Sequence, residues 1–209
     1  MIPGRARPLR DARIGRSARG WPVDLLGGAF NPSSLSGLIG WFDASEESTI
    51  TENAGAVEQW DDRSGNGKHA TQITPANRPV VTSGGLAGKD VITFDGVSDF
   101  LASALAVNQP ATVFVVVRNA NTGVYTPVIS SADAAARAET LLNDQNEFAA
   151  YGGSVIGGGT YAAATWYQIA ALFDGASSKI FADGDEKASG DLGSQDSAQV
   201  RIGSSPDTP

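Results

Sequence analysis

The chain has 209 residues, of which 41% are hydrophobic, so it can bury a core of ordinary size, and global disorder is excluded. It contains no cysteine and one histidine, which excludes a disulfide framework, thiol chemistry and a metal site built from several His or Cys side chains. Its 25 glycines favour strands and tight turns over helices.

Charge is distributed unevenly along the chain. Residues 1–20 contain a single acid and a series of arginines, namely Arg5, Arg7, Arg10, Arg13, Arg16 and Arg19. This segment carries +5, which leaves −13 for the remainder of a chain whose net charge is −8. Spaced three apart, most of these arginines would line one face of a polyproline II segment. The pattern predicts an arm that docks on an acidic partner. A solvated tail, a transit peptide and a nucleic-acid-binding arm are the alternative interpretations.

Residues 21–36 are expected to form a hinge rich in Gly, Pro and Ser. Its apolar residues, Trp21 among them, are too many for a free linker, so we expect them to pack on the domain or on a neighbouring subunit. The N-terminal residues lack the apolar segment of a signal peptide, and no run of about 18 apolar residues predicts a membrane helix.

Residues 37–209 are predicted to form one β-sandwich domain. Short apolar runs alternate with polar residues and are separated by Gly, Asn, Asp and Pro, which is typical of antiparallel strands. The expected strands are 38–44, 57–61, 70–73, 79–82, 90–94, 100–102, 111–118, 126–130, 139–142, 147–151, 166–174, 179–182, 186–189 and 199–203. Residues 132–138 are helix-like but too short to be stable alone.

Three segments carry more specific expectations. The segment 111–118 is almost entirely apolar and is expected to be a central strand that is buried on both faces. Asp183-Gly184 is a dipeptide typical of a hairpin turn. The glycines at 152–153 and 157–159 lie between expected strands and are interpreted as flexible loops.

Two motifs in the first half of the domain carry a family resemblance. The first, W-x-D-x-S-G-x-G-x-x-A-T, consists of Trp60, Asp62, Ser64, Gly65, Gly67, Ala70 and Thr71. The second, F-D-G-x-x-D-x-L, consists of Phe94, Asp95, Gly96, Asp99 and Leu101. In this order they resemble laminin-G-like, concanavalin A-like jelly-roll domains of bacterial surface proteins and tailed-phage virion proteins. The resemblance implies an all-β, antiparallel two-sheet jelly-roll sandwich, here with an extended N-terminal arm.

The same resemblance raises a question about the C-terminal edge. Domains of this kind usually continue past the strand that corresponds to 199–203, whereas this sequence ends in six residues that include two prolines. We therefore expect an unpaired edge beside 199–203, which another chain or a second copy would complete.

We expect no catalysis. Glycosidases need two carboxylates at a defined separation, and the glucanases of the resembling superfamily carry E-x-D-x-x-E along one strand, a motif that this sequence lacks. Asp61 and Asp62 are adjacent and so point to opposite faces of a strand, and Glu58 and Asp61 also diverge. We expect Asp61 or Asp62 to form the turn beside Ser64.

The candidate binding residues are few. The resemblance makes calcium the one plausible cofactor, with Asp95 and Asp99 as candidate ligands and Asp62 and Asn66 behind them. Candidate glycan-binding residues are Tyr125, Tyr151 and Tyr161, which lie near expected loops. Trp41, Trp60 and Trp166 lie within strand patterns and are expected in the core. The candidate partner-binding residues are the arginines of the arm together with Trp21.

These observations lead to one expected function and two alternatives. We expect a non-enzymatic structural protein of a phage or phage-like particle, as a head decoration, spike or fibre base at the particle surface. It would be made in the bacterial cytoplasm and anchored by its arm. Expected partners are other virion proteins, a second copy or spike chain, and cell-surface polysaccharide, but neither nucleic acid nor a membrane. The alternatives are a carbohydrate-binding module of a bacterial surface protein and a degenerate glycoside hydrolase.

Overall fold

The computed structural model describes residues 30–133, 137–143 and 145–204, and all of its strands belong to the unit Pro32–Pro209. The predicted arm, Trp21 and most of the predicted hinge lie outside the described residues. The fold class is confirmed, because the described chain is an all-β sandwich in which every strand pairing is antiparallel. Single-turn 3-10 helices occur at Pro32–Ser34, Glu47–Thr49, Pro75–Asn77 and Gly175–Ser177.

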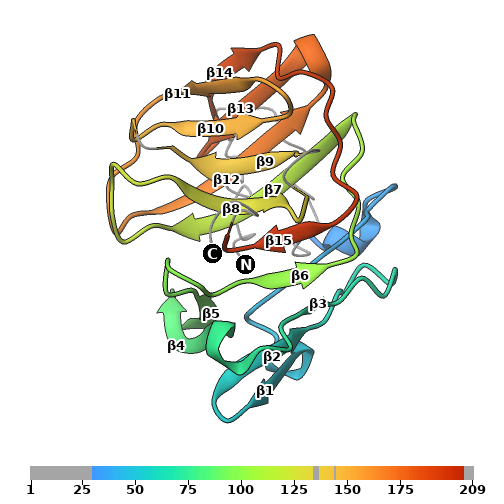
Figure 1. Ribbon diagram of the computed structural model, residues 1–209, viewed down its shortest axis with the longest axis vertical. Helices are drawn as coiled ribbons and strands as arrows, with labels where there is room; N and C mark the ends of the chain where they lie inside the picture. Colours follow the sequence, from blue (N-terminus) through green and yellow to red (C-terminus); the bar gives the residue numbers. More distant parts are fainter. Residues whose placement is uncertain (1–29, 134–136, 144, 205–209) are drawn as a thin grey trace, which may run out of the picture. The chain divides into compact units, whose positions relative to one another are not determined.

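The larger sheet has nine strands in the order β1-β2-β3-β6-β15-β8-β9-β10-β11 (Figure 1). Their bounds are β1 Ile50–Asn53, β2 Ala56–Trp60, β3 Ala70–Thr71, β6 Leu101–Ser103, β8 Thr126–Ser131, β9 Glu139–Leu142, β10 Phe148–Tyr151, β11 Val155–Gly158 and β15 Val200–Ile202. Of these, β1 and β11 were not among the expected strands. The glycines of the β11 segment predict a loop, yet the segment pairs with β10 along its whole length.

The second layer is a four-stranded sheet in the order β14-β13-β12-β7. It contains β7 Ala111–Arg118, β12 Trp166–Phe173, β13 Ser178–Ala182 and β14 Asp185–Gly190. The hairpin between β13 and β14 turns at Asp183 and Gly184, as predicted, with positive φ angles of 52° and 83°. Positive φ at both central residues gives the twist that joins two antiparallel strands by a tight turn. A separate hairpin consists of β4 Val80–Leu86 and β5 Lys89–Thr93.

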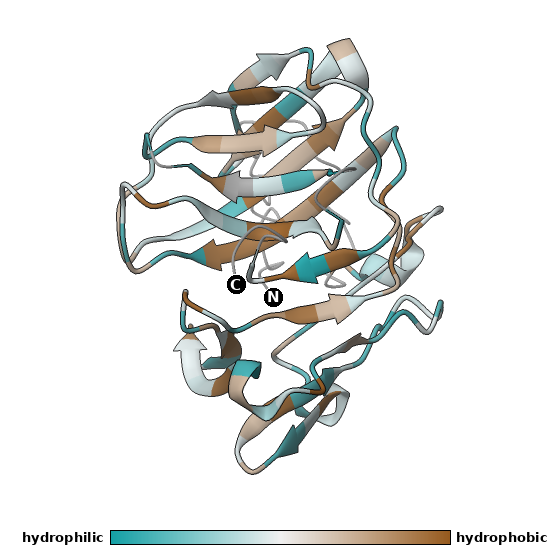
Figure 2. Ribbon diagram, viewed as in Figure 1, coloured by the Kyte–Doolittle hydropathy of each residue, from teal (hydrophilic) through white to brown (hydrophobic). Residues whose placement is uncertain are grey.

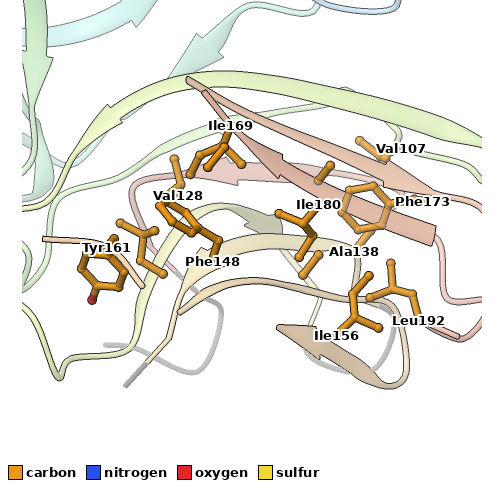
Figure 3. Close-up of a cluster of buried hydrophobic side chains, with 14 of the residues drawn as sticks. Val107, Val128, Ala138, Phe148, Ile156, Tyr161, Ile169, Phe173, Ile180 and Leu192 are labelled. Atoms are coloured by element: carbon orange, nitrogen blue, oxygen red, sulfur yellow. The ribbon is translucent and has the colours of Figure 1, made fainter. Parts of the chain in front are cut away.

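The main core lies between the two larger sheets (Figure 3). Phe148 and Leu142 extend into it from the nine-stranded sheet, and Ile169, Phe173 and Ile180 meet them from the four-stranded sheet. All five are at most 2% exposed. The alternation of buried and more exposed residues along β12 and β13 follows from the period of two in a strand, so one face of each strand packs and the other is left outside.

A second, smaller core lies at the other end of the nine-stranded sheet. Val57, Ala70 and Leu101 are its fully buried members, and the β4–β5 hairpin contributes Val81 and Ile92 to it. The strand β15 connects the two cores, because Val200 packs in the main core and Ile202 against the second one.

The predicted open edge beside 199–203 is wrong. The strand in this segment, β15, lies inside the nine-stranded sheet and pairs with β6 on one side and β8 on the other (Figure 1). A C-terminal strand can insert between strands that come much earlier in the sequence, so the end of the chain does not mark the edge of the sheet.

The expected central position of 111–118 is also wrong. Among the strands that the structure describes, β7 pairs with β12 alone and is the last strand of its sheet. Its residues alternate between half-buried and exposed, although most of them are apolar (Figure 2). An apolar sequence predicts burial on both faces, but only one face of β7 packs on the main core, through Ala111, Val113, Val115 and Val117.

The segment 38–44 is not a strand, contrary to expectation. Its backbone bonds to a loop instead of to a neighbouring strand: the Trp41 N–H donates to the Asp62 carboxylate, and the Trp41 carbonyl accepts from the Arg63 N–H. The Asn66 amide also donates to the Leu38 carbonyl. Side-chain bonds of this kind offer the backbone an alternative to a sheet.

Candidate functional site

The partner-binding residues predicted in the arm lie outside the described residues. They are Arg5, Arg7, Arg10, Arg13, Arg16, Arg19 and Trp21. Docking through the arm stays a prediction.

The first motif of the sequence closes a loop around Asp62. The Asp62 side chain accepts hydrogen bonds from the backbone N–H groups of Trp41, Ser64 and Lys68 at 2.8–3.1 Å, and from the Ser64 hydroxyl at 2.8 Å. Although burial alone would raise the pKa of the Asp62 carboxyl, these donors, led by Ser64, hold it below its ordinary value of 3.8. Asp62 therefore supports a loop, which is the role predicted for it.

Its neighbours Asp61 and Glu58 are also engaged with other side chains. Asp61 accepts from the Gln59 amide at 2.8 Å, and its carboxylate lies 3.0 Å from the His69 Nδ1. That nitrogen accepts the Asp62 backbone N–H at 3.2 Å, so it does not donate to Asp61 when the imidazole is neutral. Glu58 forms an ion pair with Arg78 at 3.2 Å.

The second motif forms a turn in which Asp95 and Asp99 bond to one another's backbone. The Asp95 carboxylate accepts from the N–H groups of Val97, Ser98 and Asp99 at 2.8–2.9 Å, and Asp99 accepts from the Asp95 N–H. The oxygens proposed as calcium ligands thus serve as turn acceptors. Within the described part of the chain, no group of three or more His, Asp or Glu side chains is arranged to hold a metal ion.

The pKa values of this pair move in opposite directions. Asp95 is exposed, and although its slight desolvation would raise its pKa, the N–H donors of Asp99, Val97 and Ser98 lower the pKa to about 2. Burial raises the pKa of Asp99 above 3.8, and the nearby charge of Asp95 adds to the rise.

We expect Asp95→Asn to reduce the free energy of unfolding by about 0.5–1 kcal/mol at neutral pH and to have little effect near pH 2. The folded-state pKa of about 2 lies below the ordinary 3.8. The charged carboxylate therefore stabilises the fold at pH values above 3.8, and this contribution is lost as the pH falls through the folded-state pKa of about 2. Urea unfolding across this range measures it. Asp191→Asn is the control, because Asp191 accepts one backbone N–H; a variant difference that persists in acid would contradict the assignment.

The three candidate glycan-binding tyrosines occupy different environments. Tyr161 is 4% exposed and packs edge-on against Phe148 in the main core, so its ring has no free face on which a sugar could stack (Figure 3). Tyr125 is 41% exposed, in the loop before β8, and Tyr151 is half-buried at the end of β10. Of the three, Tyr125 and Tyr151 are placed where a ligand could reach them.

Glu139 brings these two tyrosines together. Its Oε2 accepts the Tyr125 hydroxyl at 2.6 Å, and on β9 it lies directly opposite Tyr151 of β10. Opposite residues of an antiparallel pair project from the same face. Arg137 completes the group, with its guanidinium 5.3 Å from the Tyr151 ring centroid and its Nη1 3.9 Å from Glu139 Oε1. We call Tyr125, Arg137, Glu139 and Tyr151 the tyrosine cluster.

The cluster lies on the face of the nine-stranded sheet that points away from the main core. Leu142 of β9 and Phe148 of β10 pack in the core, and Glu139 and Tyr151 have the opposite parity along the same strands. Glu139 is itself only 1% exposed, so its carboxylate is not accessible to a substrate. It holds the Tyr125 hydroxyl from a buried position. Sequence reasoning did not select Glu139 or Arg137, although Glu139, as the charged first residue of an expected strand, was a usable signal.

An open depression of about 560 Å³ lies elsewhere, beside β1 and the β4–β5 hairpin. Glu47, Glu52 and Asp90 line it together with two serines and the apolar side chains of Ile50 and Val81. The Asp90 carboxylate accepts the Gly84 N–H at 3.0 Å, which gives it a role in the hairpin.

Comparison with known proteins gives limited information. The chain matches no protein-family model, and it matches no curated protein. Among solved structures, a beta-glucanase of Bacillus licheniformis is 13% identical, with 81% of this chain and 87% of that chain covered and a TM-score of 0.42. A likeness this loose transfers neither family, site nor activity.

The expected phage particle, its partners and the virion location stay predictions, since none of these comparisons bears on them. Among the described residues, no helix is long and apolar enough to cross a membrane.

Proposed function

We propose that this protein is a non-catalytic carbohydrate-binding β-sandwich, and that it binds sugar rings through the tyrosine cluster. The observation that carries the proposal is the pairing of an exposed ring with a fixed hydroxyl. Tyr125 is 41% exposed, and its hydroxyl is held at 2.6 Å by the buried carboxylate of Glu139.

A fixed aromatic side chain suits sugar recognition for two reasons. The apolar C–H face of a sugar ring packs on an aromatic face, while the sugar hydroxyls need nearby polar groups. A ring that is already immobilised also loses less side-chain entropy when ligand binds. Tyr151, beneath the Arg137 guanidinium, places a second ring and a hydrogen-bond donor close to the first.

The charge of the protein favours neutral polysaccharides as ligands. With a net charge of −8, the chain repels an acidic polymer at long range, and one local arginine does not reverse that field. We therefore expect neutral glucans or galactans to bind better than acidic capsular polymers.

The carboxylates support a binding role over hydrolysis. A glycosidase needs one carboxylic acid and one carboxylate within reach of the sugar. Glu139 is 1% exposed and bonded to Tyr125, whereas Asp62 and Asp95 are each bonded to several backbone N–H groups. These acids hold the protein's own structure.

We expect Tyr125→Ala and Tyr151→Ala each to weaken binding of a neutral oligosaccharide about tenfold or more, because each removes one stacking ring. Titration calorimetry against a panel of β-glucan, agar and capsular fragments measures the affinity. The same incubations should release no reducing ends.

The matched control is Trp166→Ala. Trp166 is also a half-buried aromatic beneath an arginine, Arg118 at 5.7 Å, but it belongs to the four-stranded sheet. Affinity lost in the Trp166 variant and kept in the tyrosine variants would overturn the site, absence of binding across the panel would overturn the function, and turnover would overturn the non-catalytic assignment.

A further inference from the structure

Within the described part of the chain, the strand β7 is an open sheet edge. It pairs with β12 through all eight of its residues, from Ala111 to Arg118, and no other strand of the described chain pairs with it. One side of its backbone therefore offers a row of N–H and C=O groups to another strand.

The other three edges of the two larger sheets carry features that discourage pairing, and β7 does not. The edge strand β1 has four residues, an irregular register and the charged Glu52. The edge strand β11 has four residues and ends in two glycines. The edge strand β14 begins with Asp185, Glu186 and Lys187 and has an irregular register. By contrast, β7 is long, regular and apolar, and Arg118 at its end is its one charged residue.

The side chains of β7 also lack full cover. Phe114 is 65% exposed and Val116 is 52% exposed, both on the outer face of the four-stranded sheet. On the inner face, Val113, Val115 and Val117 contact the main core but are only half-buried. A partner strand beside β7 would cover both sets of residues together with the backbone edge.

We propose that β7 is a self-association surface, on which β7 of a second copy pairs antiparallel across a two-fold axis to form a continuous eight-stranded sheet. Antiparallel pairing of one strand with itself is compatible with two-fold symmetry, because each residue and its partner exchange roles. With the axis at Val115, Phe114 of each copy lies opposite Val116 of the other. Both are outward residues, so this register also buries the exposed apolar side chains.

Charge at this edge does not oppose a second copy, although the protein as a whole is acidic. The same register places Arg118 opposite Thr112 at each end of the seam. The two Arg118 side chains are then six residues apart along the strands, or about 20 Å, which exceeds a Debye length of about 8 Å at physiological salt. The remaining residues of β7 are uncharged, so the seam brings no like charges together.

The expected strength of the association depends on the area of the interface. One paired edge with a few apolar side chains lies near or below the lower limit of about 1,200 Å² for stable interfaces. We therefore expect a reversible dimer with a dissociation constant in the micromolar range, about 1–100 µM.

Sedimentation equilibrium between about 1 and 200 µM tests this expectation. The wild-type chain should pass from monomer to dimer, and Val116→Lys should raise the dissociation constant at least about tenfold, because it places a cation in the apolar seam. Val155→Lys is the matched control: the same substitution on another edge strand, β11, at a residue that is 59% exposed. It should dimerise like the wild type. Circular dichroism and thermal melts establish that both variants are folded.

A covalent test examines the register. Because the chain has no cysteine, a Phe114→Cys, Val116→Cys double variant carries the only two thiols, and mild oxidation should join two copies through them. A double variant at the exposed Val97 and Val155 should not crosslink to a comparable extent. A wild-type chain that stays monomeric throughout the range, or a Val116→Lys variant that dimerises as tightly as the wild type, would overturn the proposal. Absence of the oxidised dimer would overturn the register.

Discussion

Asp62→Ala should lower the free energy of unfolding by about 2–4 kcal/mol. The substitution removes the acceptor of three backbone N–H groups, from Trp41, Ser64 and Lys68, and of the Ser64 hydroxyl. The Asp62 residue is 7% exposed, so water replaces these bonds poorly. Because the Trp41 bond ties the strandless segment 38–44 to the loop, we also expect that segment to lose protection from hydrogen exchange.

The adjacent residue supplies the control. The Asp61 side chain is 37% exposed and bonds to other side chains instead of the backbone, so Asp61→Ala should cost less than about 1 kcal/mol. Asp62→Asn should fall between the two alanine variants, because one acceptor oxygen remains while the new amide group faces donors. Equal losses in Asp61→Ala and Asp62→Ala, measured by urea unfolding, would show that the loop does not depend on the Asp62 carboxylate.

Gly203→Ala should cost about 3 kcal/mol of stability, for two reasons that a second variant separates. Gly203 has a φ of +94°, and a Cβ built there would lie 2.3 Å from Cδ1 of the Phe94 ring. The substitution therefore strains the backbone and also displaces an aromatic side chain that packs on the second core.

Gly55→Ala is the control for the cost of placing a side chain on a left-handed backbone conformation. Gly55 has a φ of +81° in the turn between β1 and β2, and a Cβ built there meets nothing within 4 Å. We expect it to cost about 1–2 kcal/mol from the left-handed backbone alone. The difference between the two variants in thermal or urea unfolding then measures the overlap with Phe94. If Gly203→Ala costs no more than Gly55→Ala, the ring has room to move, and the second core is less tightly packed than described.

Features of the fold that depend on short-range chemistry could be predicted from the sequence. The apolar runs at 166–174 and 179–182 predicted β12 and β13. Asp183-Gly184 predicted the turn between β13 and β14, because few residue pairs accept positive φ at both positions. The role of Asp62 was also predictable, since an aspartate beside Ser64-Gly65 bonds the backbone a few residues ahead.

The candidate site was predictable only in part. Tyr125 and Tyr151 were selected because each lies near an expected loop, but Tyr161 fits the same rule and is buried in the main core. Glu139 bonds to Tyr125, which lies in the loop before β8, and it lies opposite Tyr151 across the β9–β10 pair. Neither segment alone specifies this arrangement. Convergence of side chains that are 12–26 residues apart in the sequence depends on pairing between strands, so the tertiary structure decided it.

The positions of β7 and β15 within their sheets could not be predicted from the sequence, because they depend on how the strands pack together. An apolar run is compatible in composition with a central strand and with an edge strand, and among the described strands β7 lies at the edge of its sheet. Likewise, a last strand can lie at an edge or between earlier strands, and β15 lies between β6 and β8. Local pattern specifies which face of a strand is apolar, whereas the neighbours of that strand depend on the packing of the whole sandwich.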